Sequence, residues 1–137
     1  MLSRYAVNLI ELAGLIALFL DLRARWRSIP AVAPLHYNLR GRPLTYGPKF
    51  FLAVPAATMV FAYLLTEFTL TRPDARLPQA GPITVEAFIA LLIWSMYVMQ
   101  RALLDVAGGR RPTLDTARIA GPIALILAAT VALAASP

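Results

Sequence analysis

The sequence has no cysteine and only one histidine, His36. Without cysteine the chain has no disulfides, no thiolate metal ligands and no cysteine nucleophile. A single imidazole with no second His or Cys nearby makes a poor metal site. We therefore expect no metal centre in this protein.

Several motifs of enzymes are also missing. The sequence contains no P-loop, no Gly-x-Ser-x-Gly and no His-Glu-x-x-His, and one histidine cannot supply a pair of haem ligands. We expect a protein that is not an enzyme and that requires no cofactor. Contacts with bound lipid or pigment stay open if the chain belongs to a larger complex.

Charged residues are scarce, at 15% of the 137 residues, whereas 59% are hydrophobic and the mean hydropathy is +0.67. A soluble domain usually carries about 25% charged residues. The net charge of +6 is typical of membrane proteins whose cytoplasmic loops collect Lys and Arg, and the sequence lacks a motif for reading bases. The composition favours one membrane unit with lipids as partners and without a nucleic-acid partner.

Four apolar stretches are long enough for a helix that crosses a bilayer, which takes about 20 residues. They cover approximately residues 5–22, 50–70, 85–104 and 119–135. These stretches predict an all-α integral membrane protein. We expect a single four-helix domain over residues 1–137, with a long, proline-rich first loop.

Lys and Arg are distributed unequally between the two ends of these spans. Arg4, Arg72 and Arg76 lie at one end, and ten cations lie in the first and third loops at the other. Because cytoplasmic loops are rich in Lys and Arg, we expect both loops in the cytoplasm and both termini outside a bacterial inner membrane. The ten are Arg23, Arg25, Arg27, Arg40, Arg42, Lys49, Arg101, Arg110, Arg111 and Arg118.

Arginines surround a tryptophan where the first span ends, at Arg23, Arg25, Trp26 and Arg27. An indole prefers the depth of the lipid headgroups, and guanidinium groups bind anionic phosphates. This pattern predicts a membrane-interface anchor, with contacts to a specific partner as the alternative.

The fourth span carries small residues at spacings of three and four. Such a stripe lets the backbone of a neighbouring helix approach closely, so we expect it to pack on protein. The alternative is that alanine is merely abundant in this chain. The stripe comprises Gly121, Ala124, Ala128 and Ala132.

Asn8 and Glu11 lie three residues apart, on one face of the first span. A carboxyl group inside a membrane indicates a functional site by default. Two roles stay open: a structural hydrogen bond between helices, or the binding of an ion, proton or partner. Glu67 and Glu86 fall at the outer ends of their spans, where exposure to water is the simplest expectation and a cation-attracting cluster with Glu11 is the alternative.

The first loop contains the segment His36-Tyr37-Asn38 between prolines and ends at Lys49. We interpret His36, Tyr37, Asn38 and Lys49 as candidate binding residues for a partner or ligand. The alternative is that His36 and Asn38 tie the loop backbone together through hydrogen bonds.

The same loop resembles a known membrane domain, the domain of unknown function 1648, which also forms the N-terminal part of Sdp-type toxin-immunity proteins. The resemblance covers about residues 9–65. Tyr37 stands in place of the usual Phe, and Leu44 stands where an acidic residue often occurs. Nothing after Val85 resembles the second membrane domain of the longer immunity proteins. The matching positions are Pro30, Pro34, His36, Tyr37, Asn38, Gly41, Pro43, Gly47, Lys49 and Pro55.

From these features we expect a non-enzymatic membrane protein that docks onto other membrane subunits, as an accessory or structural part of a larger complex. The resemblance implies a first alternative, a toxin-immunity or signal-transducing membrane binder. Glu11 and Asn8 favour a second alternative, a small element of ion or proton transport.

Overall fold

Helices make up most of the computed structural model, which describes residues 2–72 and 81–135. In chain order the elements are α1 (Leu2–Trp26), β1 (Val32–Tyr37), β2 (Pro43–Pro48), the 3-10 helix η1 (Lys49–Ala53), α2 (Val54–Leu70), α3 (Pro82–Ala107) and α4 (Ala117–Ala134). Four helical segments are long and apolar enough to cross a membrane, and the second of them combines η1 with α2. The expectation of four such helices is confirmed.

Helices α1 and α3 extend beyond their predicted bounds at both ends. Helix α1 begins at Leu2 and continues past residue 22 to Trp26, and α3 begins at Pro82 and ends at Ala107. The apolar stretch alone defined the prediction, whereas a helix continues until its backbone is interrupted, here by Gly108 after α3. Arg76, which entered the charge distribution, lies outside the described residues.

The first loop contains a β-hairpin, so the fold is mostly helical, as expected, but not purely all-α. Strands β1 and β2 pair antiparallel from Val32 opposite Pro48 to Tyr37 opposite Pro43, with irregular register around His36. The prolines hold the backbone extended and belong to edge strands, which tolerate a missing N–H. Gly47 lies within β2 opposite Ala33.

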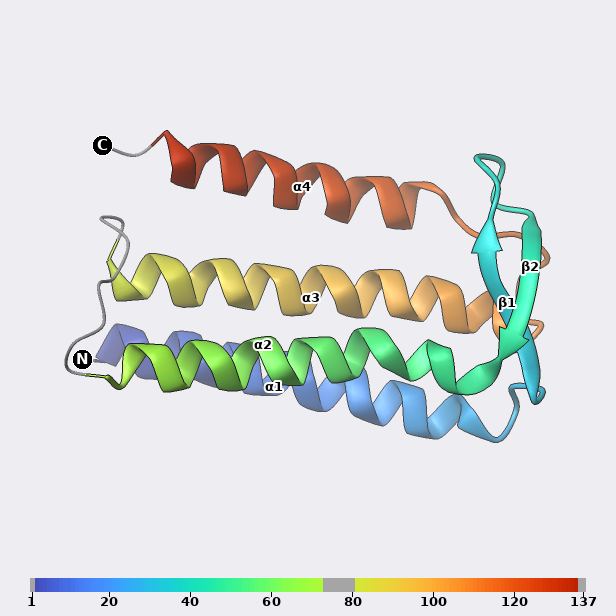
Figure 1. Ribbon diagram of the computed structural model, residues 1–137, viewed down its shortest axis with the longest axis horizontal. Helices are drawn as coiled ribbons and strands as arrows, with labels where there is room; N and C mark the ends of the chain where they lie inside the picture. Colours follow the sequence, from blue (N-terminus) through green and yellow to red (C-terminus); the bar gives the residue numbers. More distant parts are fainter. Residues whose placement is uncertain (1, 73–80, 136–137) are drawn as a thin grey trace.

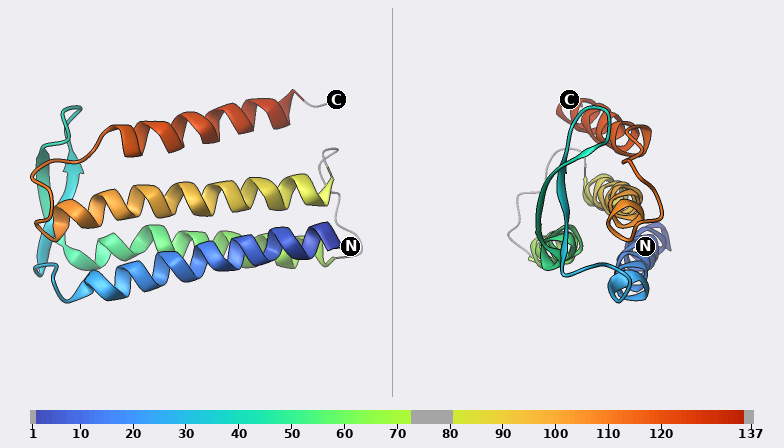
Figure 2. Two further views of the ribbon diagram at one scale, coloured as in Figure 1. Left: turned by 180° about the vertical axis from the view of Figure 1, so that it is seen from behind. Right: turned by 90° about the vertical axis from the view of Figure 1, so that its right-hand side faces the viewer.

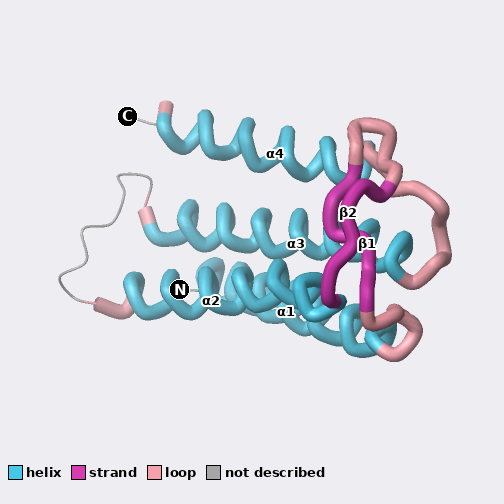
Figure 3. The backbone as a smooth tube through the Cα atoms, turned by 45° about the vertical axis from the view of Figure 1, so that its right-hand side comes forward, coloured by secondary structure: helices cyan, strands magenta, loops and turns pink. Residues whose placement is uncertain are grey.

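The hairpin lies across one end of the helices and reaches from the ends of α1 and α2 towards α4 (Figure 1, Figure 3). Gly41, at its tip, has a positive φ of 73° and accepts a hydrogen bond of 2.7 Å from the backbone N–H of Leu114, which precedes α4. A Cβ at position 41 would collide with the Leu114 carbonyl oxygen. The tip is therefore fixed to the segment that joins α3 to α4.

Helices α1 and α3 run in the same direction, whereas α2 and α4 run in the opposite one (Figure 1, Figure 2). Helix α3 contacts α1, α2 and α4, and α4 packs on α3 without a single buried residue. The start of α1 and the end of α4 consequently lie at the same end of the bundle, opposite the hairpin.

Along one face of α1 and one face of α3, buried and half-buried side chains recur at alternating spacings of four and three residues, as in a coiled coil. We call these two stripes the α1–α3 seam. Gly14 brings the two helices close together, because a Cβ there would lie 2.6 Å from Ile93 Cγ2. On α1 the seam comprises Arg4, Asn8, Glu11, Leu15, Leu18, Leu22 and Arg25, and on α3 Glu86, Ala90, Ile93, Tyr97, Gln100, Leu104 and Ala107.

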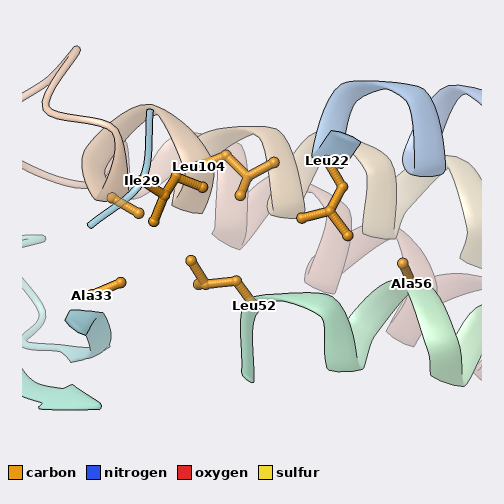
Figure 4. Packing of buried hydrophobic residues seen from close by; sticks show 7 residues of the cluster. Leu22, Ile29, Ala33, Leu52, Ala56 and Leu104 are labelled. Carbon is orange, nitrogen blue, oxygen red and sulfur yellow. The ribbon is translucent and has the colours of Figure 1, made fainter. Parts of the chain in front are cut away.

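Two apolar clusters form the core. One, beneath the hairpin, joins Leu22 of α1, Leu52 of η1 and Leu104 of α3 to Ile29 and Ala33, near or in the hairpin (Figure 4). The other lies further along the bundle around Leu18, Met59 and Ile93. The apolar centre of the seam therefore separates polar groups at its two ends.

Candidate functional site

The end of the bundle at which α1 begins holds six polar side chains from three helices. Arg4, Asn8 and Glu11 come from the seam face of α1, Tyr63 and Glu67 from α2, and Glu86 from the first turns of α3. We call this set the glutamate cluster. The 3-4 spacing of α1 places all three of its members on the same side of the helix.

Arg4 provides the positive charge of the cluster. Its Nε donates a hydrogen bond of 2.6 Å to Glu86 Oε1, and one of its terminal nitrogens lies 3.9 Å from Glu67 Oε2. One guanidinium group thereby joins the carboxylates of α2 and α3 to α1. The expectation that Glu86 lies in water is wrong, because its side chain is completely buried.

Asn8 connects α1 to α2 at the same level. Its Nδ2 donates to Glu67 Oε1 at 3.0 Å, and its Oδ1 accepts a hydrogen bond of 3.2 Å from the Tyr63 hydroxyl. Asn8 thus forms hydrogen bonds between helices, which is one of the two roles that the sequence left open for it. Tyr63 was not among the predicted residues, since its contact depends on the packing of α2 against α1.

Glu11 lies furthest along α1 from its start among the three residues that α1 contributes to the cluster, and it is 1% exposed. The charges that act on it come from Glu86, Glu67 and Arg4. Its Oε1 and the Oε2 of Glu86 are buried and have no hydrogen-bond partner in residues 2–72 and 81–135. A buried polar atom without a partner costs about 1–3 kcal/mol of stability. Each of these two oxygens can therefore accept a further hydrogen bond.

A cavity of about 370 Å³ adjoins the cluster, lined by Arg4, Tyr5, Asn8 and Glu67. The Glu67 side chain is 27% exposed. The carboxylates therefore range from Glu67, which solvent reaches, to Glu11, which it does not.

The hairpin end of the bundle holds a second group of charges in which acids and bases balance. Arg25, 6% exposed, pairs with Asp21 at 2.9 Å and with Asp105 of α3. Asp105 also pairs with Arg118, which contacts Asp115, and Asp115 contacts Arg111. Three aspartates and three arginines thus alternate in one chain of contacts.

Arg25 does not fit the predicted membrane-interface anchor, because its side chain is buried within the protein. Arg23 and Arg27 are exposed, and Trp26 is half-buried. Of these residues only Arg25 lies on the seam, three residues after Leu22. This spacing is the feature of the sequence that distinguishes Arg25 from Arg23 and Arg27.

The residues predicted in the first loop have mainly structural contacts. Asn38 Oδ1 accepts hydrogen bonds of 2.9 Å from the backbone N–H groups of Arg40 and Arg42, which shapes the hairpin turn. The Tyr37 hydroxyl donates to the Pro34 carbonyl, and burial raises the pKa of Tyr37 to about 12. His36 is exposed on β1 and does not join Asn38 in that turn.

Lys49 caps the end of α1. Its Nζ donates to the backbone carbonyls of Trp26 at 3.2 Å and Ile29 at 3.3 Å, and it lies 4.9 Å from the centre of the Trp26 ring. A cation at the C-terminus of a helix stabilises unpaired carbonyl groups. Lys49, a candidate binding residue in the sequence, therefore contacts other parts of its own chain in the structure.

The small stripe of α4 does not face the bundle. Gly121, Ala124, Ala128 and Ala132 are exposed, although Ala132 borders a groove between α3 and α4. The half-buried positions of α4 are Arg118, Ile119, Pro122, Ile126, Ala129 and Leu133. Among residues 2–72 and 81–135, no atom outside the backbone of its own helix lies within 4 Å of a Cβ built at Gly121. Packing of this stripe on protein would require a partner outside the chain.

Comparison with known proteins does not add a relative: no protein-family model, no curated protein and no solved structure matches the chain.

Proposed function

We propose that the protein crosses a bilayer with its four long helices and binds a small cation, in the simplest case a proton, at the glutamate cluster. The protein then serves as a non-enzymatic element of ion or proton transport. In this proposal the membrane is a bacterial inner membrane, the hairpin end faces the cytoplasm and the glutamate cluster lies near the outer surface. The ten cations at or near the hairpin end support this orientation.

The imbalance of charge in the glutamate cluster is the observation that carries the proposal. The cluster contains three carboxyl groups and one guanidinium group, which pairs with Glu86 and Glu67, whereas three aspartates match three arginines at the hairpin end. Uncompensated charges are very costly in a low-dielectric interior. The excess carboxylates need protons or another cation, and the balanced group does not.

Glu11 is the carboxyl group at which a proton is most needed. Arg4 makes its contacts with Glu86 and Glu67, and the Glu11 side chain is shielded from water. A protonated Glu11 would donate a hydrogen bond to the unpaired Glu86 Oε2 or to another acceptor after a small rearrangement, which lowers the cost of both buried oxygens.

A proton fits the cluster better than a multivalent metal ion does. No group of three or more His, Asp or Glu side chains in the described ranges is arranged to hold a metal ion. Divalent cations need several oxygen ligands at short distances. A shared proton needs only one carboxyl group and one acceptor.

Proton flux into proteoliposomes tests the proposal. With a pH-sensitive dye inside and a potassium diffusion potential, we expect flux with the wild-type chain and a loss of at least tenfold with Glu11→Gln, which mimics the protonated form permanently. Asp115→Asn, a carboxyl group outside the cluster, serves as the matched control and should conduct normally. Equal flux for wild type and Glu11→Gln would exclude transport through this residue.

The protonation itself has a separate test. Infrared spectra of the reconstituted protein should contain a carboxylic-acid C=O band at neutral pH, which Glu11→Gln removes and Asp115→Asn retains. If all carboxyl groups of the wild type are ionised at that pH, no proton is bound and the proposal is wrong.

A second candidate function is docking to another subunit of a membrane complex through α4. The specific observation is the outward direction of Gly121, Ala124 and Ala128 on a helix that has no buried residue. Small residues let a second helix approach closely and gain van der Waals contacts that lipid does not provide equally well. The partner in this proposal is a helix of another membrane protein.

Enlarging the small residues tests this second function. We expect a partner that co-purifies in mild detergent with the wild type to be lost from Ala124→Leu/Ala128→Leu and kept by Val60→Leu, which enlarges the exposed surface of α2 instead. A wild-type protein that is monomeric and co-purifies with nothing would contradict docking.

A further inference from the structure

A groove of about 340 Å³ lies on the outside of the bundle at the hairpin end, away from the glutamate cluster. Its walls come from the last turns of α1 and from η1. The lining residues are Phe19, Leu22, Arg23, Trp26, Arg27 and Ala53. We call it the α1–η1 groove.

The groove combines an apolar floor with two free cations at its rim. Phe19, Leu22, Trp26 and Ala53 provide the apolar surface. Arg23 and Arg27 are exposed and, in the described part of the chain, neither forms an ion pair with an acidic side chain. Arg23 belongs to α1 and Arg27 follows its last residue, and both line the same groove.

Arg25 shows why the rim charges are unpaired. It alone of the three arginines turns inward, and it takes up the contacts of Asp21 and Asp105. The acids at this end of the bundle are thereby engaged with Arg25, Arg118 and Arg111. Arg23 and Arg27 are left for an anion from outside the protein.

The position of the groove along α1 indicates which kind of anion would bind to Arg23 and Arg27. Phe19 and Leu22 lie within the apolar span, which ends at Trp26, while Arg27 follows its last residue. In a bilayer this is the depth at which acyl chains meet phosphate groups, and tryptophan prefers that depth. Lys49 contacts both the backbone carbonyl and the ring of Trp26. These contacts fix the position of Trp26, so this wall of the groove is already formed before a ligand binds.

We propose that the α1–η1 groove binds one anionic phospholipid, with the phosphate between Arg23 and Arg27 and an acyl chain along Phe19 and Leu22. Charge complementarity selects an anionic headgroup over a zwitterionic one, and the apolar floor selects a lipid over free phosphate. The volume lies in the range of about 300–1,000 Å³ that is typical of small-molecule sites. This inference depends on the proposed insertion into a bilayer, but not on proton binding at the glutamate cluster.

Native mass spectrometry of the full chain, released from detergent micelles, tests the preference. With equal amounts of phosphatidylglycerol and phosphatidylcholine that carry the same acyl chains, we expect a preference for phosphatidylglycerol on the order of tenfold, from two basic residues near the surface. Arg23→Gln/Arg27→Gln should abolish the preference, and Arg23→Lys/Arg27→Lys should retain part of it. Arg40→Gln/Arg42→Gln removes the same charge at the hairpin tip and should leave the preference unchanged.

Fluorescence gives a second readout that locates the lipid. In a Trp94→Phe background, lipids with brominated acyl chains should quench Trp26 more strongly when the headgroup is phosphatidylglycerol than when it is phosphatidylcholine. The difference should disappear in Arg23→Gln/Arg27→Gln, whose folding is checked by its unfolding curve. Inorganic phosphate alone should change neither readout.

Two results would overturn the inference. One is an equal preference and equal quenching for both lipids with the wild type. The other is a preference that Arg40→Gln/Arg42→Gln lowers as much as the groove variant does, which indicates diffuse attraction to the basic end. Extraction of cell membranes with carbonate tests insertion separately: a protein that stays in the membrane fraction but binds both lipids equally contradicts only the groove.

Discussion

Arg4 and Glu86 close the α1–α3 seam at one end of the bundle, with 2.6 Å between Arg4 Nε and Glu86 Oε1. Arg25 and Asp105 close the same seam at the other end. Between these pairs the Gln100 side-chain amide donates to the Leu18 carbonyl at 3.1 Å, and the Trp94 indole donates to the Ile10 carbonyl at 3.2 Å. A slip of either helix by one turn would break all four contacts, so they fix the register of two parallel helices.

Arg25→Gln is expected to lower the free energy of unfolding by about 3 kcal/mol, because it leaves Asp21 and Asp105 partly buried without their main cation. Reversible unfolding in mixed micelles measures the change. Arg27→Gln, two residues further on the exposed side, should stay within about 0.5 kcal/mol of wild type. Equal losses in the two variants would mean that Arg25 is not the structural residue of this end.

Gly41→Ala is expected to detach the tip of the hairpin. Gly109 provides the matched comparison, since its φ of 72° is nearly the same but nothing lies within 4 Å of a Cβ there. Gly109→Ala should cost about 1 kcal/mol through its left-handed backbone alone. Gly41→Ala should cost more, and hydrogen exchange at the Leu114 amide should accelerate only in that variant. Equal costs and an unchanged Leu114 amide would contradict the contact.

Lys49→Gln is expected to loosen the end of α1. The variant loses the cation that binds two carbonyl groups and the Trp26 ring, a loss on the order of 1 kcal/mol. In a Trp94→Phe background, the emission of Trp26 should shift to longer wavelength as water reaches the ring. Arg42→Gln has the same change of charge and should not shift the emission; a shift of the same size there would indicate a general effect of charge.

Because the Tyr37 side chain is partly buried, we expect the folded protein to lose stability at alkaline pH. Burial raises the pKa of this phenol from 10.0 to about 12, so the folded protein favours the neutral form. The resulting stability is complete below pH 10 and declines as the pH rises from 10 to 12, where the unfolded chain ionises first. Tyr37→Phe should remove this part of the decline, and an ultraviolet difference titration should show one phenol fewer near pH 12. A Tyr37 signal with a midpoint of 10 would contradict the burial of this side chain.

The four helices could be predicted because their apolar residues are contiguous in the sequence. The hairpin could not, since β1 and β2 contain prolines at Pro34, Pro43 and Pro48, and proline usually argues against a strand. One stabilising contact is local, because Asn38 shapes the turn, and another is non-local, because Gly41 binds the segment before α4. The second contact depends on how the helices bring the two segments together.

The candidate site was predicted in part. Asn8 and Glu11 were found from their spacing, but whether Glu86 meets water or Arg4 depends on α3 lying beside α1, which no local pattern encodes. The stripe of α4 shows the same limit. The half-buried positions of α4 include Pro122, Ile126, Ala129 and Leu133, which alternate with the small residues, and the sequence of α4 alone does not show which of the two faces turns towards α3.

The parallel pairing of α1 with α3 also bears on biosynthesis. In a chain that inserts into the membrane as it is made, the first helix leaves the ribosome well before its main partner exists. Until α3 arrives, Arg4 lacks Glu86, Glu11 lacks the helix that buries it, and Arg25 lacks Asp105. In such a chain the nascent α1–α2 pair would therefore be an intermediate whose polar groups on the seam lack their partners from α3.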